Sequence, residues 1–512
     1  MQISGERIRI QDYFNILFND EKVRINSDIM ENVGRCHDFL VDFSVDKVIY
    51  GVNTGLGPMA QYRIEQEDQV RLQYNLIRSH ASGSGAPLDV IYVKAAMISR
   101  LKSLSLGYSG IHPDAIQLLQ TLINENIIPF IPEHGGVGAS GDLIQLSHIA
   151  LVLIGEGEVH YQGKWQPAAT VFDQLGIQPL KIHMREGLGL INGTSVMSGI
   201  GIVNTIRARQ LMNWSVINSC MINEIVQSFD DHFSSELNST KQHNGQHRIA
   251  KAMRKVLADS SLIEKRADHL YNGKIEEKIF KQKIQEYYSL RCVPQVLGPV
   301  CDTIRYAESV LSDEVNSAND NPIVDMETKT VYHGGNFHGD YVAFEMDKLK
   351  TGITKLSMLA ERQINFLMNN KLNEVLPPFV NLGTLGLNLG MQGAQFGAVS
   401  TVAENQTLSN PVYVHSIPNN NDNQDIVSMG TNAALMAGKV IDNTFEVLAV
   451  ECLAIIQAID HLGIQDKLAS QTKMIYTKLR EVVPVFKDDK PKYQELSRIK
   501  ELLKTFNPEI IE

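Results

Sequence analysis

The sequence predicts a mainly α-helical protein with an N-terminal head domain and a long helical bundle. Apolar residues recur at helical spacing over four long stretches later in the chain, roughly residues 195–229, 294–316, 340–372 and 427–461. A glycine-rich turn at 186–193 precedes the first stretch, and we place a domain boundary there. The chain of 512 residues is long enough for two domains. We assign the head to 1–193 and the elongated bundle with the C-terminal helices to 194–512.

Local periodicity and turn residues predict the elements of the head domain. Helices are expected where apolar residues recur every three or four positions, and glycine or asparagine marks the turns between them. The expected elements are two helices within 7–43, the second opening at Ser27, a short strand at 47–49, a helix ending near Gly83, helices at 90–106 and 114–125, and a hairpin at 158–166.

Composition and charge favour a globular protein that acts on a small molecule. Hydrophobic residues make up 43% of the chain, which is typical of globular proteins. The formal net charge is −11, and lysine and arginine form no basic stripe, so a nucleic-acid partner is not expected. The first residues lack the apolar core of a signal peptide, and no apolar run is long enough to span a membrane. We therefore expect a soluble, cytoplasmic protein without a membrane partner.

The cysteine pattern predicts neither disulfides nor a metal site. The five cysteines are spread along the chain at positions 36, 220, 292, 301 and 452. Neither a Cys-x-x-Cys nor a His-Glu-x-x-His motif occurs.

The most unusual stretch is the loop at 133–142, which precedes an apolar helical run. Four glycines lie among the seven residues 135–141, so the backbone can take positive φ angles and approach itself closely. Asp142 is placed to cap the following helix, and Gly155 to end it. The unit Ala139-Ser140-Gly141 therefore sits in a bent loop just before a helix N-terminus.

Three interpretations of this loop compete with a plain turn and cap. An anion-binding loop would need Lys-Ser or Lys-Thr after the glycines, and a nucleophilic serine elbow would need glycine where Asp142 stands. Neither motif is met. In the third interpretation the nitrogen of Gly141 attacks the carbonyl of Ala139. Loss of water, including the hydroxyl of Ser140, then leaves a five-membered ring with an exocyclic methylidene, which is a strong electrophile.

Other candidate residues also have local interpretations. Tyr50, on a glycine loop, is an acid or base, or a strand-end tyrosine with a local hydrogen bond. His80 complements a helix dipole or lines a pocket. Asn192, beside a glycine, is usual turn chemistry. Arg291, three residues after Tyr288, grips a carboxylate or pairs with an acidic neighbour on the surface. The asparagine-rich run 419–425 is a solvated loop, whose last residue caps a helix.

Taken together, these motifs resemble the histidine and aromatic amino-acid ammonia-lyases. The segment Gly-Val-Gly-Ala-Ser-Gly-Asp-Leu resembles the loop that forms the cofactor of that family, 4-methylidene-imidazole-5-one (MIO). Other segments match the family in the same order along the chain, so the resemblance covers nearly the whole chain. They lie at 50–55, 192–194, 288–292, 316–322 and 334–339. It implies a carbon–nitrogen lyase with the helical fold of the histidine ammonia-lyase and fumarase class.

The resemblance also implies a role for each candidate residue. The ring forms from Ala139, Ser140 and Gly141 and captures substrate density, while Tyr50 removes the β-proton and Arg291 fixes the α-carboxylate. Ammonia leaves, and a trans-α,β-unsaturated acid remains. The further implied site residues are Ser79 and His80, which select the side chain, Asn192, Gln285 and Tyr288 near the cofactor and substrate, Phe337 in the pocket wall, and Gln424.

Two positions bear on the substrate. Histidine and tyrosine enzymes of the family both place histidine at the position of His80. At Gln424 the histidine enzymes carry glutamate, whereas tyrosine and phenylalanine enzymes carry glutamine. A phenylalanine pocket would be apolar at Ser79 and His80, since an unpaired buried imidazole is costly. The resemblance therefore implies L-tyrosine converted to trans-p-coumarate and ammonia, as in bacterial tyrosine ammonia-lyases.

The alternatives remain open at this point. Within the family they are a histidine ammonia-lyase and a tyrosine 2,3-aminomutase. Outside it they are a non-catalytic helical scaffold with an unmodified Ala139-Ser140-Gly141 and a hydrolase acylated at Ser140. Family active sites draw on several subunits, so the resemblance also implies a homotetramer with shared active sites.

Overall fold

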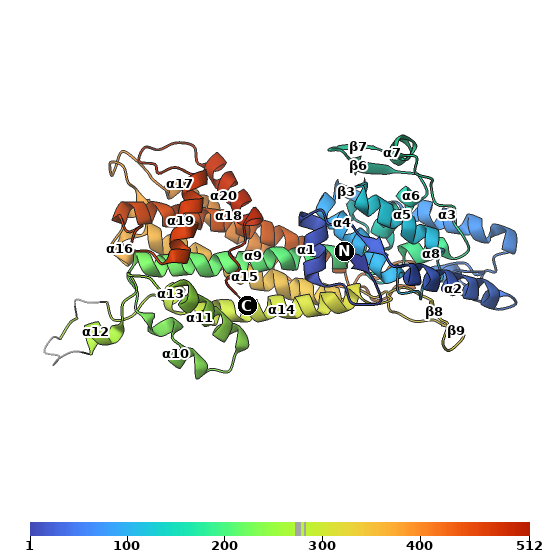
Figure 1. Cartoon of the computed structure of the whole chain (residues 1–512), viewed down its shortest axis with the longest axis horizontal. Coiled ribbons are helices and arrows are strands. Elements are labelled where there is room, and N and C mark those ends of the chain that lie inside the picture. Colours follow the sequence, from blue (N-terminus) through green and yellow to red (C-terminus); the bar gives the residue numbers. More distant parts are fainter. Residues whose placement is uncertain (272–277, 281–282, 512) are drawn as a thin grey trace. The chain divides into compact units, whose positions relative to one another are not determined.

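The computed structural model describes residues 1–271, 278–280 and 283–511, and the chain is mainly helical, as the sequence predicts (Figure 1). It divides into two compact units that are discontinuous in sequence. Unit 1 comprises residues 1–206, 307–347 and 411–437, and unit 2 comprises 207–306, 348–410 and 438–512. The domain boundary placed at 193–194 lies shortly before the first of these divisions and stays a prediction.

Four long helices contribute residues to both units, and they match the four periodic stretches of the sequence. They are α9 (Ser195–Ile225), α14 (Val293–Val315), α15 (Asp340–Met368) and α18 (Gly430–Leu462). In unit 1, a Cβ added at Gly201 of α9 would stand 2.7 Å from Leu311 of α14 and 3.4 Å from Met346 of α15. The amide of Asn204 donates to the carbonyl of Ala434 in α18 at 2.7 Å. Helix α9 thus packs against the other three.

The remaining helices of unit 1 lie along its first segment. They are α1 (Ile10–Phe18), α2 (Ser27–Ser44), α3 (Gln69–His80), α4 (Val90–Leu104), α5 (Pro113–Asn124), α6 (Leu143–Leu153), α7 (Ala168–Leu175) and α8 (Glu186–Ile191), with short 3-10 turns η1 (Gly57–Met59) and η2 (Gln66–Asp68). Helix α2 begins at Ser27 as predicted, because the side chain of Asn26 accepts the amide of Asp28.

Short strands complete unit 1. Strands β1 (Gln2–Ile3) and β2 (Arg24–Ile25) pair in parallel, whereas β3 (Ser84–Pro87) with β5 (Pro132–His134) and β8 (Ile323–Asp325) with β9 (Thr330–Tyr332) pair antiparallel. The third antiparallel sheet has the order β4 (Ile128–Pro129), β6 (Glu158–Tyr161), β7 (Lys164–Pro167). As predicted, its hairpin turns at Gln162 and Gly163, and both residues have positive φ.

Unit 2 holds shorter helices besides its parts of the long ones. They are α10 (Ser235–Ser239), α11 (Asn244–Val256), α12 (Arg266–Leu270), α13 (Tyr288–Arg291), α16 (Asn370–Asn373), α17 (Gln392–Leu408), α19 (Ser470–Val482) and α20 (Tyr493–Thr505), with η3 (Asp230–Phe233) and η4 (Pro378–Val380). All five cysteines are free. Within the described ranges, no helix combines the length and apolarity that crossing a membrane requires.

Two local predictions were wrong. The strand expected at 47–49 does not form, and a turn follows at 50–53, because the side chain of Asn53 bonds the amide of Ile49 at 2.9 Å and the carbonyl of Lys47 at 2.6 Å. The glycine-rich stretch that begins at Glu186 is the short buried helix α8 and not an open turn. Neighbouring segments pack closely enough here to hold a glycine-containing helix.

Candidate active site

A cavity of about 670 Å³ within unit 1 brings together most of the candidate residues of the head-domain motifs. Its walls come from the loop after Tyr50, helix α3, the start of α6, helix α8 with the residue that follows it, and the loop at 420–424. The predicted residues that line it are Tyr50, Ser79, His80, Ser140, Asn192, Phe337 and Gln424. This cavity is the candidate active site.

The backbone around Ala139-Ser140-Gly141 is bent in a way that favours glycine. Gly138 and Gly141 have φ angles of 78° and 70°. A Cβ at Gly141 would collide with the carbonyl of Gly193, and the amide of Asp142 donates to that carbonyl at 2.8 Å. Ala139 is buried, while Ser140 reaches the cavity. The loop is therefore held tightly and presents its middle residue to the cavity.

Two amide side chains hold Ser140. Asn192, the C-cap of α8, donates through Nδ2 to the carbonyl of Ser140 at 3.0 Å, and its Oδ1 accepts the amide of Asn321 at 2.8 Å. Gln424 donates through Nε2 to the hydroxyl of Ser140 at 3.0 Å. Segments far apart in the sequence thus converge on the residue predicted to lose its hydroxyl.

The carboxylate of Asp142 caps a different helix from the one expected. Asp142 occupies the N-cap position of α6, but its side chain makes no capping bond there. Instead it accepts the amides of Val196 and Met197, in the first turn of α9, at 2.8 and 2.9 Å. It also accepts the hydroxyl of Thr431 at 2.5 Å. Burial raises the pKa of Asp142 to about 6, although these hydrogen bonds oppose the shift.

The ring of His80 is held in one orientation by the backbone of its own helix. Its Nδ1 lies 3.0 Å from the carbonyl oxygen of Leu76, and Ser79 donates its hydroxyl to the same oxygen at 3.1 Å. Because a carbonyl only accepts, we assign the hydrogen to Nδ1, for which the Ser79 hydroxyl oxygen, also 3.0 Å away, is a second acceptor. Burial lowers the pKa of His80, so the ring is neutral near pH 7 and its Nε2 is a hydrogen-bond acceptor. Of the two local interpretations, the structure places His80 in the cavity wall.

Tyr50 lies in a turn whose ends are both held. Its phenolic oxygen accepts the amide of Gly57 at 3.0 Å, which folds the following glycine loop back over the ring. Its own amide donates to Nε2 of His333 at 3.4 Å. The carbonyl of the next residue, Gly51, accepts Nε2 of the buried Gln73 at 3.2 Å. The tyrosine is therefore anchored at the backbone and faces the cavity.

The structure does not bring Gln285, Tyr288 and Arg291 to the cavity wall, since they belong to unit 2 and do not line the cavity. The Tyr288 side chain is 72% exposed, and the guanidinium of Arg291 lies 4.3 Å from its ring centroid, so the two share a face as predicted. The buried Glu286, a possible partner of Arg291, pairs with Lys283 at 2.7 Å instead. Helix α13 is only one turn long, and Gln285 precedes it.

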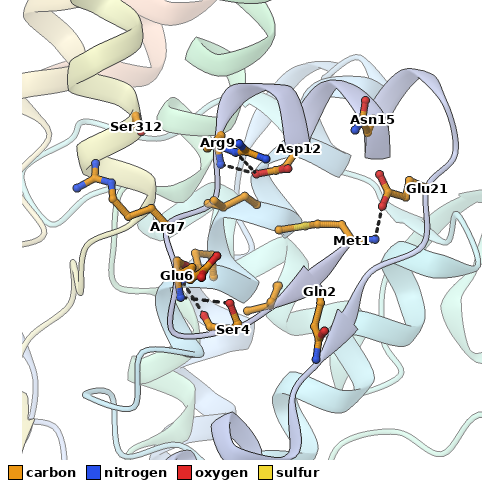
Figure 2. Close-up of a pocket in the computed structure, with 13 residues that line it drawn as sticks. Met1, Gln2, Ser4, Glu6, Arg7, Arg9, Asp12, Asn15, Glu21 and Ser312 are labelled. Carbon is orange, nitrogen blue, oxygen red and sulfur yellow. Dashed lines mark hydrogen bonds and ion pairs between the residues drawn. The ribbon is translucent and has the colours of Figure 1, made fainter.

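A second cavity of about 600 Å³ lies in unit 1 (Figure 2), but it is not a candidate active site. It is lined by the first residues of the chain, helix α1, Lys102 and Ser312. Arg9 pairs with Asp12 at 3.5 Å, and the buried ammonium of Lys102 donates to the carbonyl of Glu6 at 2.8 Å. Arg9 and Lys102 are thus bonded within the cavity wall, and none of the predicted site residues lies here.

Some cavity residues were missed from the sequence. Asn321, Asn420 and Asn423 line the cavity but carry no expected role. Asn321 belongs to a segment that matches the family, and the other two to the asparagine-rich run. That run also contains consecutive residues with φ between 53° and 58°, namely Asn420, Asn421 and Asp422. Among the described residues, no group of three or more His, Cys, Asp or Glu side chains is arranged to hold a metal ion.

Comparisons with known proteins identify the family of the chain. Residues 8–481 match the family model described as aromatic amino acid lyase. The chain is 37% identical to a histidine ammonia-lyase from Bacillus cytotoxicus, covering 98% of this chain and 97% of the relative. It is 38% identical to a tyrosine 2,3-aminomutase from Myxococcus sp., covering 96% and 95%. The crystal structure of a tyrosine aminomutase from Streptomyces globisporus superposes with a TM-score of 0.94 at 36% identity, covering 98% and 96%. The chain belongs to the aromatic amino acid lyase family.

Proposed function

We propose that this enzyme eliminates ammonia from L-tyrosine to give trans-p-coumarate, using MIO formed from Ala139, Ser140 and Gly141. The observation that carries the proposal is the composition of one cavity. It contains a tyrosine on a held turn, a serine in a tight glycine loop, a neutral histidine acceptor and an uncharged glutamine. A base, the precursor of an electrophile and a site for a phenol thus share one space.

The residues present fit the formation of MIO. Cyclisation needs a bent loop, a small first residue, a hydroxyl to lose and an unhindered third nitrogen, and Ala139-Ser140-Gly141 supplies them. Gly141 lies against the Gly193 backbone, which leaves no room for a side chain, and Ser140 projects into the cavity. Once formed, MIO supplies an electrophile that makes the substrate nitrogen a better leaving group. Asn192 would hold it, because Asn192 donates to the Ser140 carbonyl, which the ring retains, whereas Gln424 contacts the hydroxyl that is lost.

Tyr50 is proposed as the general base that takes a β-proton from the substrate. The phenolic oxygen already accepts the Gly57 amide, and that donor also suits a phenolate. The anchored turn sets the reach of the oxygen, and a general base acts only within hydrogen-bonding distance of its proton. Phe337 contributes to the wall of the same cavity and helps exclude water from the site.

His80 is proposed to receive the substrate's phenol. With its hydrogen on Nδ1 bonded to the carbonyl of Leu76, Nε2 is left as an acceptor, and a phenol O–H is a matching donor. An apolar phenylalanine ring would leave this acceptor unpaired, which costs free energy in a buried site. An imidazole N–H would also satisfy it, so the preference for tyrosine over histidine rests on the uncharged Gln424.

Arg291 is proposed to bind the α-carboxylate from a neighbouring copy, together with Tyr288 and Gln285. The described residues that line the cavity include no arginine or lysine, so a cation for the carboxylate has to come from elsewhere. Arg291 and the exposed Tyr288 stand together on one face of α13. The proposed assembly is therefore a homotetramer with shared active sites.

Helix α17 provides a surface that suits such packing. Its glycines Gly393 and Gly397 have open space where a Cβ would stand, and Phe396 is 65% exposed. A groove of about 760 Å³ in unit 2 runs beside them. The rest of unit 2 therefore leaves these small residues uncovered, and small residues permit another helix to approach closely.

The first experiment is incubation of the purified protein with L-tyrosine and, separately, with L-histidine, with products separated by chromatography and identified by mass. Coumarate without urocanate supports the proposal. The relatives named histidine ammonia-lyase and tyrosine 2,3-aminomutase make urocanate and β-tyrosine the informative alternatives. Urocanate alone would mean that Gln424 does not exclude an imidazole, and β-tyrosine would mean that ammonia returns to the β-carbon.

Intact mass tests the cofactor independently of activity. Cyclisation removes two water molecules from the chain, whereas an acylated Ser140 gains mass and a non-catalytic scaffold keeps the mass of the sequence. A protein at the unmodified mass would contradict MIO formation.

A further inference from the structure

The side chain of Gln73 joins two walls of the candidate active site. Gln73 is fully buried on α3. Its Nε2 donates to the carbonyl of Gly51 at 3.2 Å, and its Oε1 accepts the amide of Leu188 at 3.0 Å. Gly51 directly follows Tyr50. Leu188 lies in α8, the helix whose C-cap is Asn192. One amide therefore connects the proposed base to the helix that positions the contact with Ser140.

The segments meet at Gln73 without spare space. Gly51 has a φ of 73°, and a Cβ there would collide with the side chain of Leu188. A Cβ at Gly187 would stand 2.6 Å from the carbonyl oxygen of Gln73. The hydrogen bonds at Gly51 fix the direction of the turn. The Gly51 amide donates to the hydroxyl of Thr54 within the turn at 3.2 Å, and Gln73 makes the buried bond that joins the turn to α3.

The two contacts require a side chain that both donates and accepts. The amide orientation follows from them, because the reversed amide would set an N–H against the amide of Leu188 and an oxygen against the carbonyl of Gly51. Methionine has nearly the same length but offers neither bond. Glutamate retains both bonds only while its carboxyl group is protonated. Gln73 is thus matched to this position by chemistry and not by volume alone.

We infer that Gln73 is a positioning residue, which holds the backbone after Tyr50 against α8 and so sets the reach of the Tyr50 oxygen toward the substrate. The inference rests on the proposed function, in which Tyr50 removes the β-proton. His333, a solvent-exposed residue outside the turn, accepts the Tyr50 amide at 3.4 Å, which is longer than the bond from Gln73. Displacement of the base by about 1 Å is enough to slow proton transfer by about 100-fold.

The first test compares Gln73→Met with Gln457→Met. Gln457 is a matched control, because it is also fully buried and its amide also bonds in two directions, to the carbonyl of Phe486 and from Arg480, both at 2.9 Å. It lies in unit 2, outside the candidate site. We expect Gln73→Met to lower kcat by about 10- to 100-fold with KM changed less than about 3-fold. Gln457→Met should leave kcat near the wild-type value.

Two further readouts separate positioning from general loosening. With tyrosine deuterated at the β-carbon, the isotope effect on kcat should rise in Gln73→Met, because slower proton transfer becomes more rate-limiting. Hydrogen exchange should increase in the peptide that covers residues 49–57. An unchanged isotope effect, or a loss of kcat equal to that of Gln457→Met, would overturn the inference.

Gln73→Glu provides a pH test that does not require both hydrogen bonds to be removed. It tests the inference even if the methionine variant fails to fold. In this variant a protonated carboxyl group can donate to Gly51 and accept from Leu188, but an ionised one cannot donate. The kcat of Gln73→Glu should therefore fall as pH rises through the pKa of the new carboxyl, which burial raises above about 4.3. A pH profile that parallels the wild type would contradict the inference.

These measurements distinguish the two proposals. If the wild type makes urocanate or β-tyrosine and no coumarate, the substrate proposal fails, and Gln73 is tested with the amino acid that is turned over. If the wild type turns over no amino acid, the proposed function fails, while hydrogen exchange at 49–57 still reports whether Gln73 holds the turn. If coumarate forms and Gln73→Met keeps the wild-type isotope effect and exchange, only the role of Gln73 fails.

Discussion

The carboxylate of Asp142 accepts the backbone amide of Val196 at 2.8 Å, which ties the residue after Ala139-Ser140-Gly141 to the first turn of α9. An acceptor at a helix N-terminus satisfies amides that have no partner within the helix and faces the positive end of its dipole. The loop at 133–142 is therefore fixed to one of the long helices, and not only to α6, the helix that follows it in sequence.

Replacement of Asp142 by alanine should destabilise the protein. The amides of Val196 and Met197 and the hydroxyl of Thr431 would lose a charged acceptor in a buried site. We expect the free energy of unfolding to fall by about 2–4 kcal/mol, measured by urea denaturation. Asp142→Asn keeps one acceptor oxygen and should lose less. Equal stability of the wild type and Asp142→Ala would show that these bonds contribute nothing net.

Stability should decrease as pH rises, in part because of Glu451. This carboxyl group is fully buried in α18 and accepts Nδ2 of Asn218 at 2.7 Å. Burial raises its pKa to about 8, from 4.5. The folded state therefore holds a proton that the unfolded state has lost, and stability falls between about pH 4.5 and 8.

The neutral variant Glu451→Gln removes this titration. Its melting temperature should exceed that of the wild type by more at pH 9 than at pH 5, as measured by calorimetry. A difference that stays constant with pH would contradict the pKa assignment.

Replacement of His80 by leucine should weaken the use of tyrosine more than that of phenylalanine. The phenol would lose its acceptor, and an unpaired buried hydroxyl costs about 1–3 kcal/mol. We expect kcat/KM for tyrosine to fall by about 10- to 100-fold while kcat/KM for phenylalanine is maintained or rises. Both constants are obtained from product formation followed by absorbance. Equal losses for both substrates would exclude a contact between His80 and the phenol.

Two inactive variants should complement each other if active sites are shared between copies. Tyr50→Phe removes the proposed base in unit 1, and Arg291→Ala removes the proposed carboxylate partner in unit 2. Each should reduce kcat/KM by more than about 100-fold alone. Co-expression of both chains should restore part of the activity, because some sites would combine an intact Tyr50 with an intact Arg291. No recovery in verified mixed oligomers would place both residues in the same chain's site.

Long-range periodicity and local motifs were sufficient for much of the fold. The four long helices follow from apolar spacing that persists over more than twenty residues, and the hairpin at Gln162-Gly163 follows from its turn residues. The sequence did not predict the turn after Lys47, because the side chain of Asn53 bonds to the backbone groups that a strand would have needed. The sequence did not predict helix α8 either, since glycines normally disfavour a helix. Close packing around α8 compensates for its glycines.

The family, the helical class and the chemistry available at Ala139-Ser140-Gly141, Tyr50 and His80 could be inferred from residue types and their spacing. The packing of distant segments decides which of these residues share a cavity, that Asp142 caps α9 and not α6, and that His80 presents Nε2 as its acceptor. The structure also shows Gln73 linking the Tyr50 turn to α8. Hydrogen bonds between segments far apart in the chain depend on how those segments pack, and no local pattern in the sequence encodes their partners.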